Sequence, residues 1–306
     1  RPQWGLPGPG PGPGRAWDLW ARPWQPPVRP WTWAGPGPRL GRALALGVAF
    51  GVCALSNFYY GLFSALLTLV VVLHTAITDA SRVKWLRFLA LSSLSVVVSA
   101  VIALPVLLIL SGTMGAEDAM VIRDPEFVWR SLLRHNISDL ISFFRPGKHY
   151  SPDLKADYGE DLIIVTYLGW VALGLATVAL AMHRRRRNLS LWVWVFVVSF
   201  LFALGPYLHV NGEYLRLSGR RIPLPFLPFF EAFPLFSRIS HPFRFVVPAM
   251  LGLGILAGHG ARYLVRGLDR GKQRMAIGVM CAAIMAEVLL ASPAVWPMPR
   301  SDAHIP

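Results

Sequence analysis

Apolar runs without charged residues alternate with short polar segments along most of this chain. One of these runs extends from Ala43 to Thr78. A single straight helix over it would be about 54 Å long, whereas the hydrocarbon core of a bilayer is about 30 Å thick. We therefore predict two short membrane spans joined by a tight break at Ser56–Gly61, where Asn, Gly and two Tyr interrupt the run.

Five further apolar runs have the composition of membrane segments. They are Phe88–Ala116, Leu162–Met182, Asn188–Gly212, Phe245–Ala261 and Met275–Leu290. Pro105 predicts a kink in the first of them, because proline removes a helix hydrogen bond. Gly254 and Gly258 predict a small-residue face for helix packing in the fourth. The predicted fold class is all-α: a polytopic helical membrane protein with about seven membrane segments and two outer-face loop regions.

The ends of the chain differ from this helical body. GPGPGPG at Gly8–Gly14 and the Trp/Pro-rich sequence after it do not favour a regular helix, so we predict a disordered tail. The chain begins with Arg1 rather than Met, and we expect it to be a C-terminal fragment. The predicted parts are the tail 1–40, a membrane domain 41–292 with outer loops 113–161 and 209–244, and the start of a truncated extracytoplasmic segment, 293–306.

The composition also favours a bilayer environment. Hydrophobic residues make up 54% of the chain and charged residues 15%, whereas soluble domains average about 45–50% apolar and about 25% charged. The 30 basic and 16 acidic residues give a net charge of +14. A basic chain can indicate nucleic-acid binding, but these charges lie in short loops between apolar runs. We therefore expect no nucleic-acid partner.

Loop charges predict the orientation in the membrane. The short loops 77–87, 183–188 and 266–274 are basic, whereas the long polar segment 117–161 contains more acids than bases. Short basic loops remain on the cytoplasmic side of a membrane. We therefore expect a multi-pass protein of the cell membrane, with both long polar segments and the C-terminus outside.

The second outer loop carries a candidate binding site for lipid phosphate. Its Pro-rich, mostly apolar stretch Arg221–Phe245 is typical of a segment that lies in the interface or dips between helices. Arg238, His241 and Arg244 occur where this stretch enters the next span, and Arg suits bidentate contact with phosphate. The alternative is that both Arg residues only extend to the lipid headgroups and mark the end of the span.

Other ionisable residues give weaker indications. Arg145 and His149 in the first outer loop are further phosphate candidates or ordinary loop residues. Asp139 is one of several acids in that loop that could act as a base or simply be solvated. Glu287 lies towards the outer end of the last apolar run, and an acid within a membrane segment is a candidate functional residue. No metal-ligand spacing or cofactor motif occurs, so we expect neither a metal nor a cofactor.

Five stretches occur in a distinctive order along the chain. They are NFYYGLF at Asn57–Phe63, DLISFFRP at Asp139–Pro146, YLGWVALGLA at Tyr167–Ala176, LFALGPYLHVNG at Leu201–Gly212 and SRISHPFRF at Ser237–Phe245. In this order they resemble bacterial polytopic membrane proteins of the GT-C glycosyltransferase superfamily. The resemblance covers most of residues 41–306, and WPMPRSDAHIP at Trp296–Pro306 resembles the entry to an extracytoplasmic domain.

The resemblance implies transfer of a sugar from a polyprenyl-phosphate donor at the outer membrane face of the bacterial cell envelope. The implied partners are membrane lipids and that donor, and the implied lipid-phosphate residues are Arg238, His241 and Arg244. The catalytic carboxylate of the superfamily usually lies in the first outer loop near the N-terminus. This chain has no matching acidic motif, so no catalytic residue is assigned. The alternative is a transporter or a non-catalytic membrane scaffold, which the break at Ser56–Gly61 and Glu287 favour.

Overall fold

The computed structural model describes residues 39–78, 82–114, 125–134, 138–145, 166–182, 187–233 and 236–291. The architecture below is that of the unit Ala43–Pro306, into which helix α2 (Arg39–Ser56) leads. Residues 1–38 of the predicted tail and the predicted segment 293–306 lie outside the described residues. Arg39 and Leu40, which were assigned to the tail, already belong to a helix.

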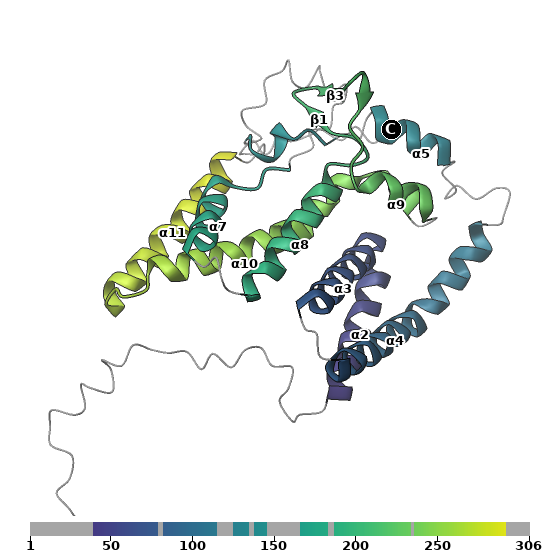
Figure 1. The fold of residues 1–306 in the computed structure, drawn as a ribbon, viewed down its shortest axis with the longest axis horizontal. Coiled ribbons are helices and arrows are strands. Elements are labelled where there is room, and N and C mark those ends of the chain that lie inside the picture. Colours follow the sequence, from purple (N-terminus) through teal and green to yellow (C-terminus); the bar gives the residue numbers. More distant parts are fainter. Residues whose placement is uncertain are drawn as a thin grey trace, which may run out of the picture. The chain divides into compact units, whose positions relative to one another are not determined.

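The described part of the chain is mostly helical (Figure 1). Its longer helices are α2 (Arg39–Ser56), α3 (Phe58–Thr78), α4 (Arg82–Met114), α5 (Pro125–Arg134), α7 (Trp170–Met182), α8 (Arg187–Ala203), α10 (Val246–Leu264) and α11 (Arg270–Ala291). The shorter ones are η1 (Ile141–Phe143), α9 (Phe226–Ala232), η3 (Phe236–Arg238) and η4 (Pro242–Phe245).

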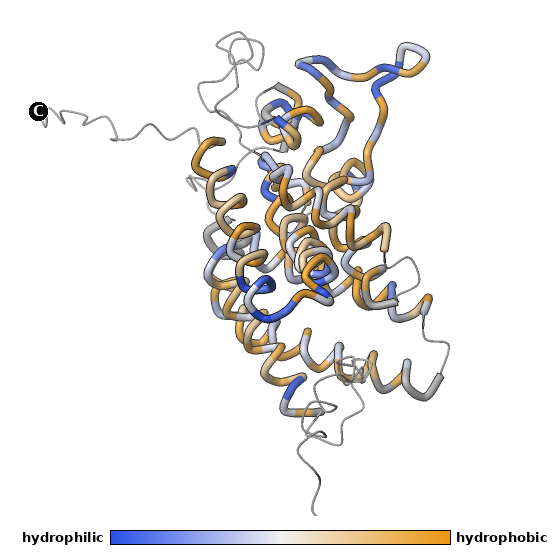
Figure 2. Tube along the Cα trace, turned by 90° about the vertical axis from the view of Figure 1, so that its left-hand side faces the viewer, coloured by the Kyte–Doolittle hydropathy of each residue, from blue (hydrophilic) through white to orange (hydrophobic). Residues whose placement is uncertain are grey.

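Four helical segments are long and apolar enough to cross a membrane. They are Tyr59–Thr78, Phe88–Ile109, Pro242–Leu264 and Arg270–Ala291. Three shorter apolar helices accompany them: Leu40–Ser56, Trp170–Met182 and Leu189–Ala203. Figure 2 shows hydrophobic residues along the helices and hydrophilic residues gathered in the loops and at helix ends. This pattern indicates a membrane protein, because a helix with an apolar surface all round is suited to lipid.

The predicted break in the first apolar run is confirmed. Helix α2 ends at Ser56 and α3 begins at Phe58. The Asn57 side-chain Oδ1 accepts a hydrogen bond from the Tyr59 N–H at 2.9 Å, and the Asn57 carbonyl accepts one from the Tyr60 N–H at 3.0 Å. Asn57 therefore caps α3, since its side chain satisfies a backbone donor of the first turn. Pro105 lies inside α4, and the kink there stays a prediction.

Two predicted spans are shorter as helices than the apolar runs that suggested them. Within the run Leu162–Met182, residues 166–169 are not helical and α7 begins at Trp170. Within Asn188–Gly212, α8 ends at Ala203. Both helix ends lie beside a glycine with positive φ: Gly169 at 87° and Gly205 at 82°. That conformation interrupts a right-handed helix and is accessible mainly to glycine.

Helix α10 packs against both α7 and α8 (Figure 1). A Cβ on Gly252 would lie 2.9 Å from the Phe196 N of α8, and a Cβ on Gly260 would lie 1.8 Å from the Leu175 O of α7. By contrast, Gly254 and Gly258 are exposed, and no atom of the described residues lies within 4 Å of the position of a Cβ there. The predicted packing face at Gly254 and Gly258 is therefore wrong, because the opposite face of α10 meets its neighbours.

The segment between α8 and α9 contains β-structure, which the all-α prediction did not include. Strands β1 (His209–Val210) and β2 (Glu213–Tyr214) form one antiparallel hairpin, and β3 (Arg216–Leu217) and β4 (Arg220–Arg221) form another. Their turns place Asn211, Gly212, Ser218 and Gly219 at positive φ. Such residues favour the tight turns that join antiparallel strands.

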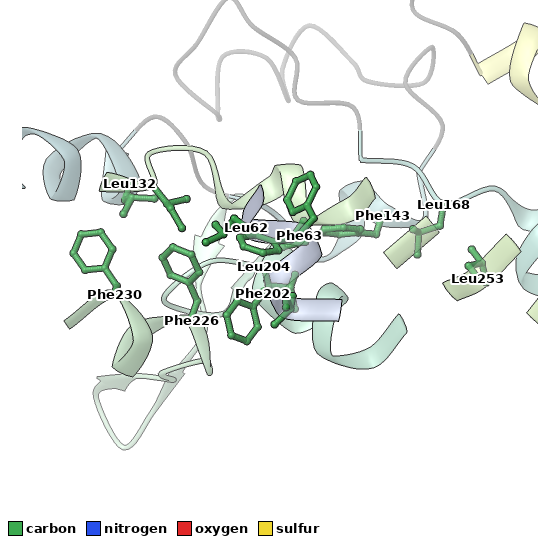
Figure 3. Packing of buried hydrophobic residues seen from close by; sticks show 14 of the residues in the cluster. Leu62, Phe63, Leu132, Phe143, Leu168, Phe202, Leu204, Phe226, Phe230 and Leu253 are labelled. Carbon is green, nitrogen blue, oxygen red and sulfur yellow. The ribbon is translucent and has the colours of Figure 1, made fainter. Parts of the chain in front are cut away.

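An aromatic core joins these loop elements to the end of α8 (Figure 3). Phe202 near the C-terminus of α8 lies with its ring centroid 5.1 to 6.2 Å from the rings of Phe226, Phe229, Phe236 and Phe245. Phe226 and Phe245 are fully buried. Such aromatic contacts stabilise a core beyond the area that they bury. The core thereby fixes α9, η3 and η4 around one end of α8.

Candidate functional site

Pro242 and Gly205 lie close together where the chain enters α10. Turn η4 begins at Pro242 and continues directly into α10 at Val246. Pro242 is buried, and its Cγ lies 3.3 Å from the position that a Cβ on Gly205 would occupy. Proline is favoured at the first position of a helix because its φ is already helical and no backbone N–H is lost. Pro242 therefore begins the helical turn that leads into α10, and it packs against the end of α8.

Arg244 lies on the first turn of this span, as the position of Pro242 predicts. Its side chain is exposed, and its Cζ lies 4.5 Å from the ring centroid of Tyr59 at the start of α3. The neighbouring Phe245 is buried with its ring 5.2 Å from that of Phe63. A cation over an aromatic face at an exposed site contributes about 0.5–1 kcal/mol. The start of α3 therefore positions the Arg244 guanidinium.

His241 lies immediately before Pro242. It is half-buried, and its Nδ1 is 2.6 Å from the Ser240 Oγ in a hydrogen bond. The imidazole also packs edge-on against the Phe243 ring at 5.5 Å. His241 and Arg244 therefore flank the proline that begins the span, and each has a defined neighbour that restricts its side chain.

The other predicted phosphate residues are not joined to this pair in the described structure. Arg238 is the last residue of η3, but its side chain is outside the described part. Arg145 follows η1 with a half-buried side chain, and its backbone N–H donates to the Ile141 carbonyl at 3.0 Å. His149 lies outside the described residues. The best-defined candidate site is therefore His241 and Arg244 with Tyr59.

A buried Asp–His pair connects the segment before α7 with the segment after α8. The Asp139 Oδ2 lies 3.0 Å from the His209 Nδ1, and both side chains are almost completely buried. The Asp139 carboxylate also accepts hydrogen bonds from the backbone N–H groups of Ile141 at 2.7 Å and Gly212 at 2.9 Å. A backbone bond from the Leu140 N–H to the His209 carbonyl, 2.9 Å long, completes the connection.

These hydrogen bonds determine the charge state of Asp139. Burial opposes ionisation and is the largest single influence, but the hydrogen bonds from His209 and from the backbone of Gly212, Ile141 and Asn211 together outweigh it. The pKa of the Asp139 carboxyl is therefore lowered below its usual value. A buried carboxylate engaged by this many donors holds the segment 138–145 on β1. The sequence drew attention to Asp139 only as one of several loop acids, and His209 was not singled out.

Glu287 has a structural role that its position in an apolar helix did not reveal. Its carboxylate accepts hydrogen bonds from the Tyr167 hydroxyl and from the backbone N–H groups of Trp170 at 2.6 Å and Val171 at 3.1 Å. The last two donors are the first N–H groups of α7. A carboxylate satisfies such unpaired donors and interacts favourably with the positive end of the helix dipole. Glu287 of α11 therefore caps α7 from a neighbouring helix.

In the part of the chain that the structure describes, no group of three or more His, Cys, Asp or Glu side chains comes together in a way that would hold a metal ion. No protein-family model, curated protein or solved structure matches this chain.

Proposed function

We propose that this chain is part of an integral membrane protein that binds a polyprenyl-phosphate-linked sugar at the outer membrane face, as a GT-C-like glycosyltransferase does. In this proposal all seven apolar helices cross the membrane, and the candidate site binds the donor phosphate. The observation that carries it is Arg244, an exposed arginine on the first turn of an apolar span, with its Cζ over the Tyr59 ring.

The contact with Tyr59 supports phosphate binding because it fixes where the guanidinium lies. The Arg244 Cζ is 4.5 Å from the Tyr59 ring centroid, while the Arg244 side chain stays exposed. Guanidinium N–H donors make bidentate contacts to phosphate oxygens. His241, on the other side of Pro242, would add a further donor. An anchor that only reached for the headgroups would not need a fixed position.

The catalytic residue remains unassigned in this proposal. An inverting sugar transfer needs a base for the acceptor as well as stabilisation of the leaving phosphate. Asp139, the sequence-derived candidate in the first outer loop, is buried and bonded to His209 and two backbone N–H groups. It is therefore poorly suited to meet an acceptor. The alternative of a transporter or scaffold loses one of its arguments, because the Glu287 carboxylate is occupied as a helix cap.

The proposal is tested by the binding of undecaprenyl phosphate to the purified protein in detergent, measured by native mass spectrometry. We expect Arg244→Lys to weaken binding roughly tenfold, because Lys keeps the charge and loses the planar donors. Arg266→Lys is the matched control, since Arg266 is exposed just beyond the opposite end of α10. Equal binding by the wild type and both variants would leave Arg244 as a membrane anchor and remove the basis of the proposal.

A further inference from the structure

The hairpin β3–β4 is an exposed and well-defined projection. Arg216 pairs with Arg221 and Leu217 with Arg220 across the two strands. The intervening residues Ser218 and Gly219 have φ of 51° and 80°. A two-residue turn with positive φ at both central positions matches the natural twist of a hairpin. The tip is therefore held by its own turn geometry.

The base of the hairpin is fixed to the elements below it. The Arg221 Cζ lies 4.2 Å from the ring centroid of Tyr214 and 5.7 Å from that of Tyr207. The Tyr214 hydroxyl donates to the Leu133 carbonyl of α5 at 2.8 Å, and the Tyr207 ring lies 6.2 Å from that of Trp129. The hairpin is thus connected to α5 through these side chains, while β3 and β4 themselves are exposed.

The two faces of the hairpin have different chemistry. Alternate residues of a strand point to opposite faces, so Arg216 and its cross-strand partner Arg221 share one face. Leu215 and Leu217 lie on the other face, which Leu217 shares with its cross-strand partner Arg220; the two leucines are 45% and 70% exposed. Cations directly opposite each other across a hairpin repel. Among the residues that the structure describes, no carboxylate forms an ion pair with Arg216, Arg220 or Arg221.

We propose that the segment Leu215–Arg221 docks an acidic protein segment that also carries an apolar side chain. Carboxylates of the partner would neutralise the arginines, and its apolar side chain would cover Leu217. Arginine is enriched at protein interfaces, and complementary charge directs such partners to each other. A small free anion would leave the leucines uncovered. Binding of the same arginines to anionic lipid headgroups is the outcome that the vesicle arm of the test below distinguishes.

The test uses the whole chain in nanodiscs of neutral lipid and a fluorescent peptide in which Glu residues surround a Leu pair. A peptide with Gln in place of Glu is the control ligand. We expect the double variant Arg216→Glu/Arg220→Glu to bind the acidic peptide at least about tenfold more weakly, because attraction becomes repulsion. Leu217→Ser should weaken binding of the same peptide by a smaller factor. Arg221, Tyr214 and the turn residues stay unchanged, so the hairpin itself is preserved.

The matched control is Arg266→Glu/Arg274→Glu, which changes the net charge equally at exposed residues outside the hairpin. Loss of binding in the hairpin variant alone supports the proposal. Equal loss in both double variants would mean that only the overall charge attracts the peptide, and this would overturn it. The proposal is also overturned if the hairpin variant binds the peptide normally but fails to bind vesicles of anionic lipid, because the hairpin would then recognise lipid.

Discussion

Gly260 of α10 lies directly against the backbone of Leu175 in α7, so closely that a Cβ at residue 260 would be 1.8 Å from the Leu175 carbonyl oxygen. Helices in membranes associate largely through such close packing of small residues. We predict that Gly260→Ala destabilises the protein by roughly 1–3 kcal/mol, because the two helices must separate to accommodate the methyl group. Unfolding in mixed micelles with increasing SDS measures this effect.

Gly254→Ala and Gly258→Ala are the controls for that experiment. They lie on the same helix, but nothing approaches the position of their Cβ atoms. Since alanine favours a helix more than glycine does, these variants should be neutral or slightly stabilising, by up to about 1 kcal/mol. A similar loss of stability in all three variants would contradict the packing of α10 against α7.

The connection between Asp139 and His209 is expected to give the region around β1 an acid-sensitive stability. A carboxyl with a lowered folded pKa stabilises the fold at pH values above its unfolded pKa of 3.8, and the contribution is lost as the pH falls through the lowered folded pKa. Thermal unfolding followed between pH 7 and pH 3 should therefore show a loss of stability at the acidic end. Asp139→Asn should remove that part of the pH dependence and reduce stability at pH 7 by about 1–3 kcal/mol.

A double-mutant cycle separates this pair from general burial effects. If Asp139 acts mainly through His209, the combination of Asp139→Asn and His209→Gln should cost clearly less than the sum of the single changes. Fully additive effects would show that the backbone donors at Ile141 and Gly212, and not His209, account for the stabilisation.

Glu287 should behave as a helix cap and not as a transport residue. We predict that Glu287→Leu lowers the stability of the protein by about 1 kcal/mol, because the N–H groups of Trp170 and Val171 lose their acceptor. Glu287→Gln keeps an acceptor oxygen and should lose less. Met285→Leu changes an exposed residue of the same helix and is the control. If Glu287→Leu unfolds in SDS like the wild type, the cap contributes nothing measurable.

The sequence allowed prediction where one local feature decides the structure. The break before α3 is an example, since Asn57 and Gly61 interrupt an apolar run and Asn57 itself caps the next helix. The helical turn η4, which begins at Pro242 and leads into α10, is another. In both cases the determining residues are neighbours in the chain.

Prediction failed where the determining residue lies far away in the sequence. Residues 166–169 are apolar enough for a helix, but the carboxylate that caps α7 belongs to Glu287. Asp139 and His209 are 70 residues apart, and neither sequence context indicates the other. The packing face of α10 also depends on its neighbours: Gly252 and Gly260 contact helices, whereas the equally small Gly254 and Gly258 do not.

Three contacts between residues far apart in the sequence show which ends of the helices lie next to each other. The Arg244–Tyr59 contact brings together the beginnings of α10 and α3, and the Glu287 cap brings together the end of α11 and the beginning of α7. The hydrogen bond between His74 and Ser190, 2.7 Å long, joins the last turns of α3 to the first turn of α8. These pairs fit helices that run in alternate directions, with the end of α3 and the beginning of α8 on the same side.

The side of the membrane on which the short basic loops lie is the last prediction. Because short loops rich in Arg and Lys remain in the cytoplasm, residue 186 should be cytoplasmic and residue 148 external. We expect a membrane-impermeant maleimide to label Lys148→Cys in intact cells and to leave Arg186→Cys unlabelled until the cells are lysed. Both substitutions belong in a background with Cys53→Ala and Cys281→Ala, since Cys281 is itself exposed on α11. Labelling of residue 186 but not of residue 148 in intact cells would invert the orientation and place Arg244 at the cytoplasmic face, where an external sugar donor would not reach it.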